Sequence, residues 1–405
     1  MGVLKLGMFE TLALSVLAIY FGDYIRLKFP ILKKYCLPSA VVGGTIFSCI
    51  SLALYYAGIA ELSFDYKTVN TLFYCIFFAA SGAAASLALL KTGGKLVLIF
   101  AILAAILAFL QNVLSVGLGV AMGMNPLIAL MTGSIPMTGG HGNAAAFAPL
   151  AVKAGAPAAL EVALAAATFG LVSGCIVGGP FGNFLIKRFH LEDPSLDGKE
   201  DDSTATGKSV GTLVSKANIL DAVFLMMLAI GMGQVFFIML KAGGINFPIH
   251  VCAMLAGILI RLYLDYQNKT TDAGYEAINI VGEFSLSLFV SMSIISMKLW
   301  QLAGLAGPLL VLLIAQVVFI IIFCYFLTFK LLGKNYDAAV MSVGHIGFGL
   351  GAVPVSMTTM STVCTKYRYS RLAFFVVPVI GGFLSNITNA IIISGFINYC
   401  AAMIK

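Results

Sequence analysis

Apolar residues occur along this chain in long runs, which are separated by short polar or charged stretches. A helix needs an apolar run of about 20 residues to cross a bilayer. Ten runs approach this length, near residues 7–25, 38–58, 69–90, 95–122, 159–186, 217–240, 246–264, 279–300, 307–331 and 371–400. The pattern therefore predicts an all-α membrane protein with ten transmembrane helices.

Two further apolar stretches, residues 126–150 and 336–362, differ from these runs in composition. Both are rich in Gly, Pro, Ser and Thr, and each contains one histidine. Gly and Pro interrupt the helical hydrogen bonds, and the freed backbone groups cannot face hydrocarbon. We therefore expect each stretch to form a re-entrant hairpin, which enters the membrane, turns, and leaves on the same side.

A polar stretch at residues 190–216 has no apolar periodicity and predicts a linker. It divides the chain into membrane units at residues 1–189 and 217–405. If neither hairpin crosses, each unit has five spans, and most of the 24 Lys and Arg residues fall on the side of the linker. Because Lys and Arg concentrate in cytoplasmic loops, the linker is expected in the cytoplasm and both termini in the periplasm.

The two units also resemble each other in sequence. Matching residues recur 210 positions apart before the hairpins and 204 apart at the hairpin turns. They include Pro38 and Pro248, Gly123 and Gly333, Asn125 and Asn335, and the pairs Gly140-His141 and Gly344-His345. Since an odd number of spans inverts the second copy, the hairpins would enter from opposite faces. Many secondary transporters share this inverted-repeat architecture.

The composition argues against several classes of function. Only 10% of the residues are charged and 60% are hydrophobic, whereas about a quarter of a soluble protein is charged. The net charge of +7 lies in short loops, so no nucleic-acid partner is expected. The eight cysteines are scattered singly, which indicates neither a zinc site nor a disulfide framework. We find no nucleophile–base pair and no ATP-binding motif, so the chain is not expected to be an enzyme, and no cofactor is expected.

The predicted hairpin turns carry the candidate substrate-binding groups. Glycine leaves backbone groups accessible, and the N-terminus of a half-helix attracts a carboxylate. The candidates are Thr138, Gly139, Gly140, His141 and Gly142 in the first turn, Gly344, His345, Gly347 and Gly349 in the second, and Asn386 in the last span. The alternative is that the glycines only permit close helix packing. Both histidines are interpreted as neutral, hydrogen-bonded residues rather than proton carriers.

A sodium ion is the expected coupling ion, and neutral oxygens suit it as ligands. The candidate sodium ligands are Ser134, Thr138, Asn143, Asp337 and Asn386. Gln111, Asn112 and Asn389 are further polar residues near the middle of apolar spans. Such residues usually face protein or a cavity, and the alternative is that they connect helices by hydrogen bonds.

Several segments carry a family resemblance. They are LKKYCLP at 32–38, GGHG at 139–142, ATFGLV at 167–172, GGP at 178–180, SLSLF at 285–289, KLW at 298–300, and GKNYDAAV at 333–340 followed by Gly344-His345. Over essentially its whole length the chain resembles the bacterial glutamate:sodium symporter family. The resemblance implies sodium-driven uptake of L-glutamate across the inner membrane by an elevator-type carrier, usually a homodimer. The last span of the family often has an aspartate where this chain has Asn386.

The sequence leaves two other functions open. One is symport of another dicarboxylate or amino acid, coupled to sodium or protons. The other is an ion channel, which would need a continuous polar path. The repeat and the paired hairpins favour alternating access over a channel.

Overall fold

The computed structural model describes residues 2–34, 37–83, 87–191, 214–243, 248–267, 271–302 and 304–404. The predicted linker at 190–216 lies mostly outside these residues. The described chain is helical apart from one short parallel ribbon, in which β1 (Gly2–Leu6) pairs with β2 (Ala60–Phe64) and Gly2 lies opposite Ala60. The sequence pattern did not predict this ribbon.

Nine helical segments within the described residues are long and apolar enough to cross a membrane. They are α1 (Met8–Lys28), α3 (Ser39–Tyr56), Gly94–Ala121 of α5 (Leu87–Ala121), α9 (Ala159–Arg188), α10 (Lys216–Ala242), α11 (Ile249–Tyr266), α12 (Asp272–Ile295), Ala306–Leu331 and Arg371–Ile404. The last two segments each contain a π-helical stretch. Ala306–Leu331 comprises α13 (Ala306–Phe323), η3 (Cys324–Thr328) and α14 (Phe329–Leu331), and Arg371–Ile404 comprises α17 (Arg371–Val379), η4 (Ile380–Leu384) and α18 (Ser385–Ile404).

The tenth predicted span, near residues 69–90, corresponds to a shorter helix. Helix α4 (Lys67–Ala83) has 17 described residues. The following helix, α5, is broken at Gly94, whose φ of 53° and ψ of −144° are not helical. Two minor helices, α2 (Pro30–Lys34) and η2 (Leu299–Leu302), complete the connections between the long ones.

Both predicted hairpin regions consist of short helices separated by breaks. The first contains α6 (Pro126–Leu130), α7 (Ser134–Met137) and α8 (Gly140–Lys153). The second contains α15 (Tyr336–Leu350) and α16 (Val353–Lys366), which pack against each other across a turn at Gly351 and Ala352. The two regions begin alike, because Asn125 and Asn335 cap their first helices through side-chain oxygens.

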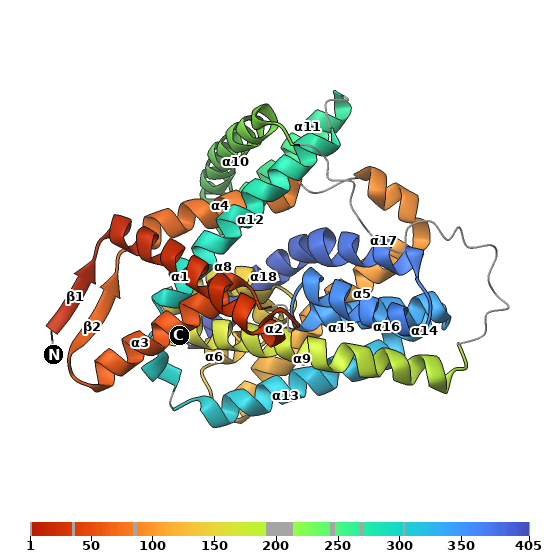
Figure 1. Ribbon diagram of the computed structural model, residues 1–405, viewed down its shortest axis with the longest axis horizontal. Helices are drawn as coiled ribbons and strands as arrows, with labels where there is room; N and C mark the ends of the chain where they lie inside the picture. Colours follow the sequence, from red (N-terminus) through yellow and green to blue (C-terminus); the bar gives the residue numbers. More distant parts are fainter. Residues whose placement is uncertain are drawn as a thin grey trace.

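The helices pack as two groups (Figure 1). Helices α1, α3, α4, α10, α11 and α12 form what we call the peripheral bundle, and the helices of α5–α9 and α13–α18 form the central bundle. Glycines allow close crossings in the peripheral bundle, since a Cβ added to Gly82 or Gly257 would collide with the facing backbone at Met254 or Ala79. The central bundle contains both hairpin regions.

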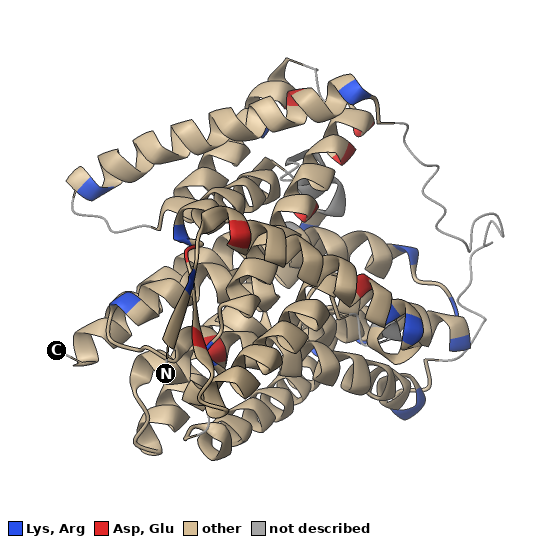
Figure 2. Ribbon diagram, turned by 60° about the vertical axis from the view of Figure 1, so that its left-hand side comes forward, with Lys and Arg blue, Asp and Glu red and all other residues tan. Residues whose placement is uncertain are grey.

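Charged residues lie mainly at helix ends and in connections, and long stretches of each helix carry none (Figure 2). Both chain ends lie toward the left in Figures 1 and 2. The placement of charged residues at helix ends is the one expected when the helix bodies face hydrocarbon or each other.

Candidate functional site

The turns of the two hairpin regions meet inside the central bundle. A Cβ added to Gly140 would lie 2.8 Å from the carbonyl oxygen of Gly351 and 4.0 Å from the Cβ of Ala352. Helix α8 begins at Gly140, and α16 begins directly after Ala352. The first N–H groups of a helix have no partner within it and carry partial positive charge. Two helix N-termini therefore lie side by side at this point.

The first of these turns depends on a left-handed residue. Gly140 has a φ of +59°, a conformation that costs other L-residues about 1–2 kcal/mol. The preceding Gly139 lies beneath the side chain of Asn143, with which an added Cβ would collide. Asn143 is buried, and its Nδ2 has no hydrogen-bond partner among the described residues. Glycine is thus required twice in succession where α8 begins.

A single side chain of α5 connects the two turns. The Gln111 Nε2 donates to the carbonyl oxygen of Gly349 at 2.7 Å, and Thr138 Oγ1 donates to Gln111 Oε1 at 2.6 Å. Gln111 is completely buried. The end of α15 and the residue before Gly139 are therefore held at fixed positions relative to α5.

The next residue of α5 and a residue of α18 hold the start of α7. Asn112 Oδ1 accepts a hydrogen bond from the Ser134 backbone N–H at 2.8 Å. Ser134 Oγ donates to Asn389 Oδ1 at 2.6 Å, and Asn389 Nδ2 donates back to the Ser134 carbonyl oxygen at 3.0 Å. All three residues are completely buried, and Asn112 Nδ2 has no partner in the described structure.

Gln316 of α13 extends this network. Its Nε2 donates to the Gln111 carbonyl oxygen and to Ser115 Oγ, both at 2.8 Å. Its Oε1 has no partner within the described residues. Because an unpaired buried polar atom costs about 1–3 kcal/mol, a polar partner would be stabilising at each of the free amide atoms of Asn112, Asn143 and Gln316.

The two histidines make fixed local contacts. His141 Nε2 lies 2.9 Å from Thr168 Oγ1, and that hydroxyl donates its proton to the Leu164 carbonyl oxygen. His141 must therefore donate through Nε2–H. His345 Nδ1 lies 2.9 Å from Thr328 Oγ1, and its ring stacks on Phe348. These contacts fit the interpretation of hydrogen-bonded histidines, and they place His345 within α15 rather than at its turn.

The second glycine cluster lies differently from what the sequence suggested. Helix α15 continues through Gly344, Gly347 and Gly349. An added Cβ would lie 2.7 Å from Val377 at Gly344, 2.5 Å from Ser356 at Gly347 and 2.6 Å from Ile320 at Gly349. These glycines thus permit close helix packing. The Gly349 carbonyl oxygen accepts from Gln111 of the polar network, and the Gly344 carbonyl oxygen accepts from Ser356 Oγ of α16. The turn itself is formed by Gly351 and Ala352, which sequence reasoning missed.

Two of the candidate sodium ligands, Asp337 and Asn386, make no hydrogen bond to either turn among the described residues. Asp337 is in the first turn of α15, about 20 Å along the helix axis from Leu350, and its Oδ1 accepts from Ser370 Oγ at 2.6 Å. Asn386 donates to the Gly382 carbonyl oxygen of its own helical segment at 2.7 Å. Ser134 and Thr138 do come together, since the Thr138 backbone N–H donates to the Ser134 carbonyl oxygen, and the α18 residue that bonds to Ser134 is Asn389.

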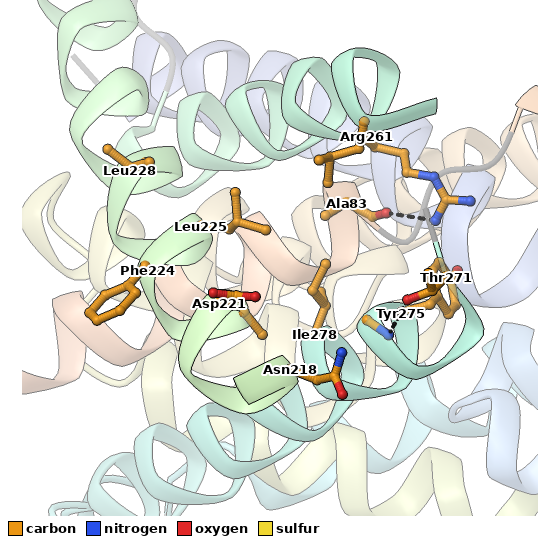
Figure 3. A pocket seen from close by; sticks show the side chains of 13 residues that line it. Ala83, Asn218, Asp221, Phe224, Leu225, Leu228, Arg261, Thr271, Tyr275 and Ile278 are labelled. Carbon is orange, nitrogen blue, oxygen red and sulfur yellow. Dashed lines mark hydrogen bonds between the residues drawn. The ribbon is translucent and has the colours of Figure 1, made fainter. Parts of the chain in front are cut away.

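A cavity of about 620 Å³ in the peripheral bundle is a competing location (Figure 3). Arg261 is its most buried charged residue, but that guanidinium is already bonded. Its Nε donates to Asp265 at 2.8 Å, its Nη1 to the Ala83 carbonyl oxygen at 3.4 Å, and the group lies 4.7 Å from the ring centre of Tyr275. This arrangement connects α4, α11 and α12, and its geometry is that of a structural link.

The long apolar helices of the described residues define a multi-pass α-helical membrane protein. The family model for "Sodium/glutamate symporter" matches residues 4–369. Two relatives named sodium/glutamate symporter, from Escherichia coli K12 and Haemophilus influenzae, are each 34% identical over 95% and 94% of this chain and 95% of their own length. The chain belongs to the sodium/glutamate symporter family, and it is a transporter rather than an enzyme.

Proposed function

We propose that this protein couples the inward flow of sodium to uptake of L-glutamate across the bacterial inner membrane. The observation that carries this proposal is the meeting of the α8 and α16 N-termini at Gly140 and Gly351. Helix N-termini stabilise anions without a basic side chain. L-Glutamate has two carboxylates, so one can be placed at each N-terminus. The names of the similar proteins support the same substrate and ion.

In this proposal the residues around Gly139 bind the substrate. Backbone groups of Gly139, Gly140, His141 and Gly142 receive one carboxylate, together with the Thr138 hydroxyl. Residues Gly351 and Ala352 receive the other, in place of Gly344, His345 and Gly347. His141 is held by Thr168, which keeps the start of α8 in position.

Sodium is proposed to bind beside the substrate, at neutral oxygens of Ser134, Thr138 and Asn143, with Asn389 as the contribution of α18. No group of three or more His, Cys, Asp or Glu residues comes together in the described part of the chain. Hydroxyl, amide and backbone carbonyl oxygens are therefore the ligands on which a sodium site here would depend.

We further propose ten spans in two inverted five-helix repeats, each with a re-entrant hairpin. Local geometry supports this pairing. Gly123 and Gly333 both have positive φ and both precede a capping asparagine by two residues. Pro38 and Pro248 precede α3 and α11 with nearly the same backbone angles. Helix α4 is then the tenth span, and the units are residues 1–189 and 217–405, joined by a cytoplasmic linker.

The two bundles suggest how alternating access occurs. The central bundle holds both hairpin regions, and the peripheral bundle packs mainly on itself. In an elevator-type mechanism the central bundle carries the substrate across the membrane while the peripheral bundle stays in place, in a homodimer embedded in the bilayer. Sodium and substrate then reach one site from either face.

The direct test is uptake of radiolabelled L-glutamate into proteoliposomes containing the purified protein. Uptake should follow an inward sodium gradient without ATP, and it should fall to background when potassium replaces sodium. Unlabelled dicarboxylates and amino acids, added as competitors, define the substrate range. Full activity with a proton gradient alone would exclude sodium coupling, and the absence of counterflow would indicate a channel instead.

The proposed topology predicts that two single cysteines label from opposite faces. Asp65 lies between β2 and α4, and His190 follows α9. With five spans in the first repeat, Asp65→Cys should react with an impermeant maleimide from the periplasm and His190→Cys only from the cytoplasm. Labelling of both from one side would contradict the five-plus-five arrangement. Ser203, a further position in the linker, lies outside the described residues.

A further inference from the structure

A cavity of about 650 Å³ lies between the two bundles, away from the cavity of Figure 3. We call it the lysine vestibule. It is lined by Lys67 of α4, Lys153 of α8 and Lys241 of α10, by the buried residues Asn70 and His250, and by part of α18. Its lining residues, all within the described chain, include no Asp or Glu. The vestibule therefore carries net positive charge.

The three lysines are not neutralised within the described structure, where the ion pairs involve other residues. Lys241 Nζ lies 5.9 Å from the centre of the Phe237 ring. This cation–π contact does not neutralise the charge of the lysine. All three side chains are exposed. Concave surfaces lined by one sign of charge raise the local concentration of oppositely charged small molecules. An anion is the ligand that this surface favours.

The buried end of the vestibule offers two unpaired polar atoms. Asn70 is 3% exposed and His250 is 1% exposed. Asn70 Oδ1 and His250 Nε2 have no hydrogen-bond partner among the described residues, although both residues line the cavity. A hydrogen-bond acceptor at Asn70 suits an ammonium group. A ligand with both an ammonium group and carboxylates would satisfy both ends of the vestibule.

The vestibule also runs toward the proposed substrate site. Ala146 and Pro149 of α8 line it, and Ala146 is six residues from Gly140, or about 9 Å along the helix axis. Lys241 lies at the end of α10 opposite Lys216, and the 27 residues of that helix extend about 40 Å. The open end of the vestibule is therefore on the membrane side opposite the linker.

We propose that the lysine vestibule is a first binding site for an anionic amino acid with two carboxylates, occupied before the substrate reaches the hairpin turns. The lysines hold the carboxylates, and Asn70 Oδ1 accepts from the ammonium group. This proposal rests on the proposed function for the identity of the substrate. The site itself is assigned from the cavity, its charges and its unpaired atoms.

The transport test uses the triple variant Lys67→Gln, Lys153→Gln, Lys241→Gln in proteoliposomes at constant sodium. We expect kcat/KM for L-glutamate to fall about tenfold, mainly through KM, because charged clefts accelerate capture by such factors. Added choline chloride should raise KM for the wild-type protein, since salt screens exposed charges, and should have little effect on the variant. Lys5→Gln, an exposed lysine of β1 outside the vestibule, is the matched control.

A labelling test is independent of transport. Asn398→Cys, an exposed vestibule position, is introduced in a background in which the eight native cysteines are replaced by serine. The new thiol should react faster with an anionic than with a cationic methanethiosulfonate reagent, and L-glutamate should slow the reaction. Replacing the three lysines should remove both the preference for the anionic reagent and the protection by L-glutamate. Asn70→Leu should weaken protection by glutamate but not protection by glutarate, because glutarate has no ammonium group.

The outcomes separate the two proposals. Protection by glutamate in a protein without sodium-driven uptake would retain the vestibule and reject the proposed function. Normal uptake by the triple variant, with unchanged KM and an unchanged ratio of reagent rates, would reject the vestibule and retain the proposed function.

Discussion

Replacing Gly140 by alanine is expected to lower sodium-driven L-glutamate uptake about tenfold, and replacing it by valine about 100-fold. Gly140 has a φ of +59°, and an added Cβ would lie 2.8 Å from the Gly351 carbonyl oxygen. Left-handed backbone costs alanine about 1–2 kcal/mol, and about 1.4 kcal/mol corresponds to a tenfold change. A β-branched residue is less tolerated there. Initial uptake rates, normalised to the amount of inserted protein, measure the effect.

The matched control is Gly231→Ala in α10. No described residue lies within 4 Å of a Cβ added there, and its φ is not positive. Alanine favours a helix by about 1 kcal/mol over glycine, so uptake should stay within about twofold of wild type. Gly58, although exposed, is less suitable because its φ is +70°. Normal transport by both Gly140 variants would show that the meeting of the turns is only a packing contact.

The spanning helices were largely predictable because the thickness of the hydrocarbon layer imposes a length on each apolar run. Nine of the expected spans have matching helices among the described residues. Features that depend on few residues were not predictable in this way. The β1–β2 ribbon has five residues in each strand, and the break in α5 arises from the conformation of Gly94 alone.

The site was only partly predictable, because residues of one type play different roles. Gly140 forms a turn, whereas Gly347 sits within a helix against Ser356, and Gly351 forms the second turn. Contacts with residues distant in the sequence decide between these roles. Gln316 did carry a signal, since it is the only strongly polar residue in the apolar segment Ala306–Phe323.

The two asparagines of α18 illustrate the same limit. Asn386 and Asn389 both stand out in an apolar run, and sequence reasoning chose Asn386 for the site. In a helix, residues three apart are displaced by about 60° around the axis because a turn has 3.6 residues. Asn389 reaches Ser134, while Asn386 bonds within its own helical segment. A single sequence does not show which side of the helix faces the hairpin turn.

This difference leads to the prediction that Asn389→Leu raises the sodium concentration for half-maximal uptake about tenfold or more. The substitution removes two hydrogen bonds to Ser134. It leaves the hydroxyl of Ser134 without its partner in a buried position, which costs about 1–3 kcal/mol, whereas the carbonyl oxygen still accepts from the backbone N–H groups of Thr138 and Gly139. Since Ser134 is a proposed sodium ligand, its displacement should weaken sodium binding. Uptake at saturating glutamate, measured over a range of sodium concentrations, gives this value.

Asn386→Leu is the matched control, because it makes the same chemical change in the same helix. Within the described residues its side chain bonds to the Gly382 carbonyl oxygen and to no proposed sodium ligand. A local hydrogen bond of about 0.5–1.5 kcal/mol contributes to the stability of the helix rather than to sodium binding, so we expect the half-maximal sodium concentration to change by less than about threefold. The opposite order, with Asn386→Leu shifting the sodium dependence more than Asn389→Leu, would contradict the proposed ligand set. It would place the ion at Asn386, and the contact between Asn389 and Ser134 would then serve only to hold α7 against α18.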